Sequence, residues 1–184
     1  MIYDTYAPTE QPELEKIFEL MQIQSGETFC DLGSGDGRVV IHAAQSGATA
    51  TGIEYDTNWC TTSINTIQTQ NIQNATILQQ DFYTIGDFSQ YKIIYTNLSE
   101  DMCVSLWDKF VHAKNNGSRI FMYMGIEGFR RCHNIQTPIY DNPPTPVEVI
   151  KFNLTHNPWF LGLPGYNDVP STPQTYTHVL LIMR

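Results

Sequence analysis

The residues best suited to chemistry in this sequence are a run of glycines between two acidic side chains. The run contains Gly33, Gly35 and Gly37; Asp31 precedes it, and Glu54 follows twenty-three residues after Asp31. Glycines let the backbone approach a ligand closely because they have no side chain. A carboxylate such as Glu54 can accept hydrogen bonds from both hydroxyls of a ribose. The pattern therefore predicts a site for an adenosine-containing ligand.

The spacing of the glycines distinguishes between two kinds of adenosine ligand. Dinucleotide-binding loops have the pattern GxGxxG, whereas residues 33–37 read Gly-Ser-Gly-Asp-Gly. Asp31 and Asp36 would repel a pyrophosphate, but they would attract the ammonium and sulfonium groups of S-adenosylmethionine. We therefore expect S-adenosylmethionine as the cofactor, with Gly33, Ser34 and Gly35 among its binding residues.

Two further pairs of residues stand close to the ends of expected strands. Asp81 and Phe82 follow a strand at 75–79, where the carboxylate could bind the adenine amino group and the aromatic ring could cover the base. Tyr95 and Asn97 stand at the end of the next strand, where they would face the transferred methyl group. Asn97 could accept a hydrogen bond from an acceptor amine, or it could instead cap the following helix.

These candidate residues need a scaffold, and the apolar periodicity predicts alternating strands and helices. Expected strands are 28–32, 48–54, 75–79, 91–95 and 119–124, and expected helices are 12–22, 38–45, 58–70 and 100–113. Short links between such units imply parallel strands with right-handed crossovers. Prolines then interrupt residues 138–173, around a sixth strand at 147–154, and a last strand spans 175–183. We expect one domain over 1–184, an open, mostly parallel Rossmann-like α/β sheet with helices on both faces and an antiparallel C-terminal strand pair.

Composition limits the possible partners. The net charge is −9 and the pI is near 4.8, so a nucleic acid would be repelled over most of the surface. A basic protein or a neutral small molecule is easier to accommodate. No apolar run approaches the ~20 residues that cross a bilayer, so we expect no membrane partner and a cytoplasmic protein.

The cysteines and histidines do not predict a metal site. Four cysteines are spread along the chain without a CxxC pair, which favours buried free thiols; they are Cys30, Cys60, Cys103 and Cys132. Four of the five histidines stand far apart in the second half of the sequence, which favours surface or structural roles; they are His112, His133, His156 and His178.

Residues 31–38, Asp-Leu-Gly-Ser-Gly-Asp-Gly-Arg, resemble the first motif of class I S-adenosylmethionine-dependent methyltransferases. Within that superfamily, residues 6–9 (Tyr-Ala-Pro-Thr), residues 35–41 and the pair Thr96-Asn97 resemble small non-SET protein lysine methyltransferases. The resemblance implies that residues 1–22 cover the cofactor, with Tyr6 and Thr9 at its methionine end. Alternatively, Thr9 is a polar residue at an ordinary capped helix start. The proline-rich stretch 138–173 departs from the family pattern.

The resemblance implies transfer of a methyl group to a lysine amine in a protein. The residues alone leave two other functions open: a small-molecule N- or O-methyltransferase, and a non-catalytic module that binds an adenosine ligand. Methyl transfer to a neutral nucleophile depends mainly on in-line positioning, so the sequence needs no catalytic triad for either enzymatic function.

Overall fold

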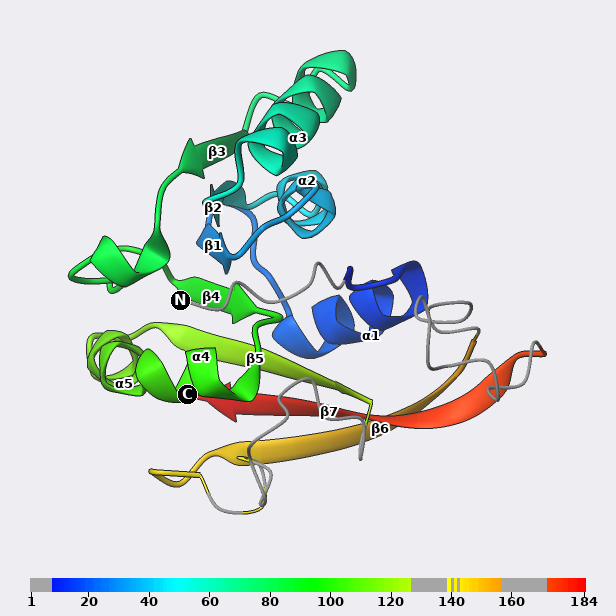
Figure 1. Cartoon of the computed structure of the whole chain (residues 1–184), viewed down its shortest axis with the longest axis vertical. Helices are drawn as coiled ribbons and strands as arrows, with labels where there is room; N and C mark the ends of the chain where they lie inside the picture. The colour runs from blue at the N-terminus through cyan, green and yellow to red at the C-terminus, as the bar shows by residue number, and fades with distance from the viewer. Residues whose placement is uncertain (1–7, 127–138, 140, 142, 157–171) are drawn as a thin grey trace.

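The computed structural model describes residues 8–126, 139, 141, 143–156 and 172–184. A seven-stranded sheet with strand order β3-β2-β1-β4-β5-β7-β6 forms its centre (Figure 1). The strands are β1 (Thr28–Leu32), β2 (Thr49–Glu54), β3 (Ala75–Gln79), β4 (Ile93–Thr96), β5 (Arg119–Ile126), β6 (Glu148–His156) and β7 (Gln174–Met183). The first five are parallel, and β7 pairs antiparallel with both β5 and β6. The predicted fold, including the antiparallel C-terminal pair, is confirmed.

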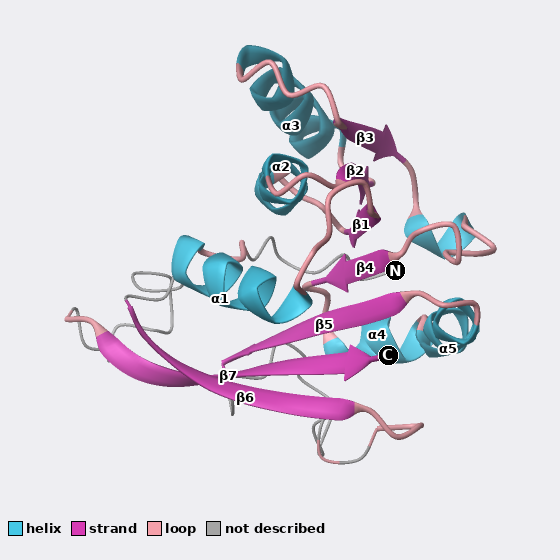
Figure 2. Cartoon of the chain, turned by 180° about the vertical axis from the view of Figure 1, so that it is seen from behind, coloured by secondary structure: helices cyan, strands magenta, loops and turns pink. Residues whose placement is uncertain are grey.

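Helices cover both faces of this sheet. The helices are α1 (Gln11–Met21), α2 (Arg38–Gln45), α3 (Thr57–Thr69), α4 (Glu100–Ser105) and α5 (Trp107–Asn115), with a 3-10 turn, η1, at Phe82–Thr84. Side chains of α1 and α2 pack on one face around Phe29, Tyr95 and Phe121. Those of α4 and α5 pack on the other face around Leu32, Ile94 and Met122. Figure 2 shows the two groups of helices apart, with the strands between them.

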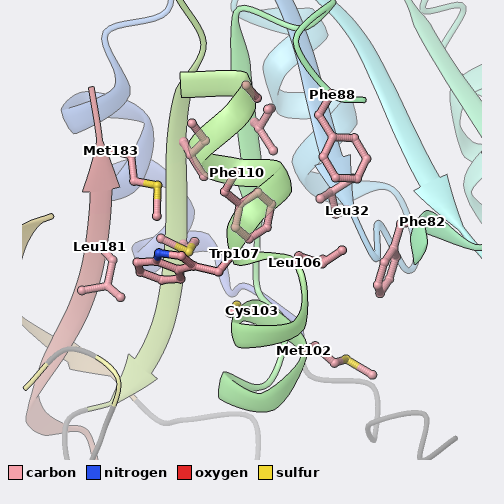
Figure 3. Close-up of a cluster of buried hydrophobic side chains, with 14 of the residues drawn as sticks. Leu32, Phe82, Phe88, Met102, Cys103, Leu106, Trp107, Phe110, Leu181 and Met183 are labelled. Atoms are coloured by element: carbon pink, nitrogen blue, oxygen red, sulfur yellow. The ribbon is translucent and has the colours of Figure 1, made fainter. Parts of the chain in front are cut away.

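The region expected as one helix over 100–113 forms two helices that meet at Leu106. Leu106 has φ −97° and ψ −1°, which ends α4 and begins α5. Its side chain is fully buried, as is that of Phe110 on α5, whereas Met102 on α4 lies at the other end of the cluster (Figure 3). The break lets both short helices bury apolar side chains that one straight helix could not direct at the same curved surface.

Local sequence accounts for the start of α1. Pro12 stands in its first turn, where the missing N–H of proline costs no helical hydrogen bond. The backbone N–H of Glu10 donates to Glu13 Oε2 at 2.8 Å, and the Glu10 side chain caps the backbone of Glu13 in return. This reciprocal capping fixes where the helix begins. None of the helices in the described part of the chain is long and apolar enough to cross a membrane.

Candidate active site

The glycine loop joins β1 to α2 at the carboxyl edge of the sheet. Gly33, Gly35 and Gly37 have φ values of 78°, 52° and 79°, which lie in the left-handed region that glycine adopts without strain. The N–H of Gly33 donates to Ile53 O at 2.8 Å, and that of Gly37 donates to Ser34 O at 2.9 Å. The loop is therefore a compact turn tied to β2, and it directs the chain into α2.

Close packing beneath the loop also requires small residues. A Cβ added to Gly33 would lie 2.8 Å from Leu98 Cδ2. On β2, a Cβ added to Gly52 would lie 2.5 Å from Ser34 Oγ, so a glycine there makes room for the serine. The Ser34 hydroxyl is buried and has no hydrogen-bond partner among the residues that the structure describes. The sequence analysis did not single out Gly52, because only the sheet register brings it beneath the loop.

Glu54, at the end of β2, holds the loop through its carboxylate. Oε2 accepts a hydrogen bond from Gly35 N at 2.8 Å, and Oε1 accepts from Tyr55 N and Asp56 N, each at 2.8 Å. A carboxylate has about four acceptor positions, so three backbone bonds occupy most of them. The ribose role predicted for Glu54 therefore requires a ribose hydroxyl to share the carboxylate with Gly35, or to replace it.

Asp31 is the buried acid of the site. It lies on β1 with 2% of its surface exposed, and burial, followed by the charges of Glu54 and Asp36, raises its pKa well above the ordinary value. Asp36 has a cation of its own, because Arg38 Nη2 lies 2.7 Å from Asp36 Oδ2. Of the two acids expected to attract a cationic ligand, Asp31 is the one whose charge is most in need of such a ligand.

Three residues far apart in sequence meet at the wall of the site. Thr9 Oγ1 lies 2.8 Å from Tyr95 Oη, and Asn97 Nδ2 donates to the same Oγ1 at 3.1 Å. Thr9 is 3% exposed and Tyr95 is 1% exposed. The simpler alternatives for Thr9 and Asn97 are wrong, because Glu10 is the N-cap of α1 and Ser99 is the N-cap of α4.

Most of the predicted site residues line one small pocket. Its walls include Thr9, Asp31, Gly33, Ser34, Gly35, Tyr95 and Asn97, together with Pro8, Asp36, Arg38 and Val39. The sequence analysis assigned no site role to Pro8 or Val39, since apolar residues of this kind carry no chemical signal. Glu54 reaches this pocket through its bond to Gly35. The predicted Tyr6 lies outside the described residues.

The predicted adenine residues lie apart from that pocket. Asp81 caps η1, with Oδ1 accepting from Tyr83 N at 2.9 Å. Phe82 is 9% exposed and belongs to the hydrophobic core, with its ring centroid 4.7 Å from that of Tyr83. Both residues follow β3, next to β2 in the sheet, so they share the carboxyl edge with Glu54. Their proposed contacts with adenine stay predictions.

Two of the histidines expected to be isolated form a pair. His156 Nε2 and His178 Nε2 are 3.1 Å apart, because the β6–β7 hairpin brings their strands together. Burial, followed by the charge of His156, lowers the pKa of His178 to about 4, so its ring is neutral at neutral pH. The expectation for cysteines holds where it can be examined: Cys30, Cys60 and Cys103 are buried free thiols, and Cys132 lies outside the described residues.

The residues of the pocket fit S-adenosylmethionine. The buried Asp31 carboxyl, whose charge is disfavoured by burial and by two neighbouring acids, suits the ammonium or sulfonium group of that cofactor. The Ser34 hydroxyl adds a buried polar atom beside the loop. A pyrophosphate would instead bring negative charge next to Asp31.

Comparison with solved structures supports the same type of fold. The RNA methyltransferase of Salinibacter ruber, in complex with S-adenosyl-L-homocysteine, superposes with a TM-score of 0.60 at 20% identity, covering 96% of this chain and 93% of that one. The precorrin-6y C5,15-methyltransferase of Geobacter metallireducens has a TM-score of 0.65 at 12% identity, covering 96% and 88%. At such identities the likeness concerns the fold.

The fold and the glycine loop define a class I S-adenosylmethionine-dependent methyltransferase. Residues 31–124 match the sequence model of the ANTKMT methyltransferase domain. That match covers half of the chain, and the protein belongs to this family.

Two relatives are similar in sequence. An ATP synthase lysine N-methyltransferase of Homo sapiens is 39% identical over 49 residues, which are 27% of this chain and only 21% of the human protein. The protein-lysine N-methyltransferase of Saccharolobus islandicus (strain REY15A) is 24% identical over 155 residues, covering 82% of this chain and 88% of that protein.

Proposed function

We propose that this enzyme transfers the methyl group of S-adenosylmethionine to the side-chain amine of a lysine in another protein. The observation that carries the proposal is the neutral wall of the pocket, in which Thr9 joins Tyr95 and Asn97 by hydrogen bonds of 2.8 and 3.1 Å. The names of both relatives, each a lysine N-methyltransferase, support this choice of acceptor. Family membership supports turnover over a non-catalytic binding module.

The loop and Asp31 would hold the cofactor. Asp31 would bind a cationic group, and Glu54 would bind the ribose while keeping the loop in shape through Gly35. When bound, the cofactor supplies a methyl group activated by a positively charged sulfur. The protein's task is then to present an acceptor in line with that methyl group, and proximity of this kind supplies much of the rate enhancement.

The wall residues suit an amine that must first lose a proton. A lysine has an ordinary pKa near 10.4, and an environment with little water lowers it by disfavouring the charged form. Tyr95 and Thr9 are almost fully buried and carry no charge at neutral pH. The Asn97 amide, oriented by its bond to Thr9, supplies a polar group that can direct the amine.

Acidic residues near the wall suit a basic protein substrate. Glu100 and Asp101 form the first turn of α4, three and four positions after Asn97. Glu100 Oε2 already accepts a hydrogen bond from Ile139 N at 3.2 Å, whereas Asp101 is exposed. Asp101 is therefore the better candidate for contact with a basic peptide, and methylation should slow as salt screens that contact.

The deciding experiment incubates the enzyme with isotope-labelled S-adenosylmethionine and cell extract, followed by mass spectrometry. We expect labelled methyl groups on lysine side chains of one or a few proteins. Label confined to small metabolites would overturn the lysine proposal in favour of a small-molecule N- or O-methyltransferase.

Asn97→Ala tests the wall directly. The variant should lower kcat by about tenfold or more, with a smaller effect on cofactor affinity, because an orienting group acts mainly in the chemical step. Asn65→Ala, at an exposed position of α3, is the matched control and should leave both quantities unchanged. Equal kinetic constants for Asn97→Ala and the control would remove Asn97 from the acceptor site.

A further inference from the structure

A second cluster of titratable side chains lies behind the glycine loop pocket, between α1 and the C-terminal hairpin. It brings together Glu13 of α1, His156 of β6 and His178 of β7. Their exposed fractions are 4%, 7% and 0%. None of the three lines the cofactor pocket. Charged or metal-binding groups buried to this extent need a compensating partner.

The distances within the cluster suit a single small ion. His156 Nε2 and His178 Nε2 face each other at 3.1 Å, and Glu13 Oε1 lies 3.9 Å from His156 Nε2. One ligand atom from each residue lies within 4.8 Å of those of the other two. A tetrahedral zinc ion with bonds of roughly 2.0–2.1 Å places its ligand atoms about 3.3 Å apart, so small side-chain movements would complete the site.

The opposite nitrogen of each imidazole is already held. His178 Nδ1 lies 2.6 Å from Tyr123 Oη, and His156 Nδ1 lies 3.3 Å from Glu10 Oε2. The His178 ring also stacks on Phe152, with centroids 5.5 Å apart and planes 12° from parallel. Metal-binding histidines commonly make such a bond from the second nitrogen, and it orients the ligating one. Here both Nε2 atoms are directed at each other and toward Glu13.

Charge and donor type narrow the choice of ion. Two imidazoles and one carboxylate form the His2Glu set that zinc and similar divalent transition metals prefer, whereas calcium and magnesium prefer oxygen donors. Glu10 and Glu13 together bring up to two negative charges beside the imidazoles. A divalent cation would balance that charge in a buried space.

We propose that Glu13, His156 and His178 bind one divalent transition-metal ion, best fitted by Zn²⁺, which fastens α1 to the β6–β7 hairpin. The three ligands come from the two ends of the chain, so the ion would act as a cross-link. Glu10 and Thr9 immediately precede α1, and Thr9 forms the wall of the cofactor pocket. The ion would therefore also hold the segment that closes this pocket.

The test uses the untagged full chain after treatment with a chelator. Adding Zn²⁺ should give binding of one ion per chain and raise Tm by several degrees, because an ion that binds only the folded state stabilises it. Co²⁺ should give the visible absorption of a four-coordinate site, and Zn²⁺ should compete with it. A Tm unchanged by saturating Zn²⁺ would overturn the proposal and leave a metal-free hydrogen-bonded histidine pair.

Variants locate the ion. His156→Gln and His178→Gln should each weaken Zn²⁺ binding at least 100-fold, whereas His112→Gln, with a side chain 61% exposed, is the matched control. Tyr123→Phe keeps all three ligands and should weaken binding by roughly 10–100-fold through loss of the orienting bond. Unchanged affinity in both cluster variants would refute the site.

X-ray absorption at the zinc edge tests the wild-type protein without relying on the folding of any variant. We expect scattering from two imidazole rings. Fewer than two would refute the assignment.

Discussion

Replacing Thr9 with valine should detach the segment before α1 from β4, because valine keeps the shape of threonine but lacks its hydroxyl group. Thr9 is 3% exposed, and its Oγ1 makes hydrogen bonds of 2.8 Å to Tyr95 Oη and 3.1 Å to Asn97 Nδ2. A typical hydrogen bond contributes about 0.5–1.5 kcal/mol net, and more when its loss leaves a buried group unsatisfied. Losing two should lower the free energy of unfolding by about 2–3 kcal/mol.

For a chain of this length, 1 kcal/mol shifts Tm by roughly 2–4 °C, so Thr9→Val should lower Tm by roughly 4–10 °C. Urea unfolding of the ligand-free protein gives the free energy, and calorimetry with S-adenosylhomocysteine gives the cofactor affinity, which should also fall because Thr9 lines the pocket. Thr61→Val is the control, since its exposed hydroxyl bonds only within α3, to Thr57 O. It should change stability by less than about 0.5 kcal/mol.

A double-mutant cycle identifies the bond itself. Tyr95→Phe removes one of the two hydrogen bonds that Thr9→Val removes, so the two changes together should cost less than their sum by about 0.5–1.5 kcal/mol. The reasoning is refuted if Thr9→Val matches Thr61→Val in stability and cofactor affinity. Strict additivity of the double variant would show that Thr9 and Tyr95 do not interact.

Three other substitutions probe the glycine loop. Asp31→Asn should raise the Tm of the ligand-free protein yet weaken cofactor binding in calorimetry; burial raises the pKa of Asp31, so this acid stabilises the fold below about pH 3.9 and that contribution is lost as pH rises through its folded-state pKa. The advantage of the variant in Tm should therefore grow from acid to neutral pH, and a constant difference would contradict the assignment. Glu54→Ala should lower both stability and cofactor affinity, the latter by about 1.5–3 kcal/mol, because charged hydrogen bonds are lost; a normal affinity in calorimetry would exclude a ribose contact. Gly37→Ala, whose Cβ would lie 2.6 Å from Ser63 Cβ, should cost about 1–3 kcal/mol more in urea unfolding than Gly26→Ala, which has a similar φ and open space around it; equal costs would mean that backbone strain alone matters.

Elements defined by local sequence were predicted closely. The strand at 28–32 and the helix at 38–45 have the bounds of β1 and α2, since the glycine loop separates two short apolar segments of different periodicity. The break at Leu106 was missed because residues 100–113 are apolar at helical spacing on both sides of it. Which surface each half covers depends on the curvature of the sheet, and no local signal reports that.

The candidate site divides in the same way. Asp31 and the glycines could be assigned from sequence because they are neighbours in the chain and their spacing carries the chemistry. The bonds of Thr9 could not, since Thr9 and Tyr95 are 86 residues apart and meet only when α1 docks beside β4. The sequence offered capping as an alternative for Thr9, and the position of Glu10 as N-cap removed it.

The histidine cluster depends entirely on tertiary structure. His156 and His178 stand on different strands, and the antiparallel register that pairs Phe152 with His178 brings their rings together. A shift of that register by one residue would turn one ring to the opposite face of the sheet. The sequence by itself therefore determined the class of fold and the cofactor loop, because both rest on short-range patterns of apolar and glycine residues. The wall of the pocket and the Glu13–His156–His178 cluster were decided by packing, because strand register and helix docking join residues that no local interaction connects.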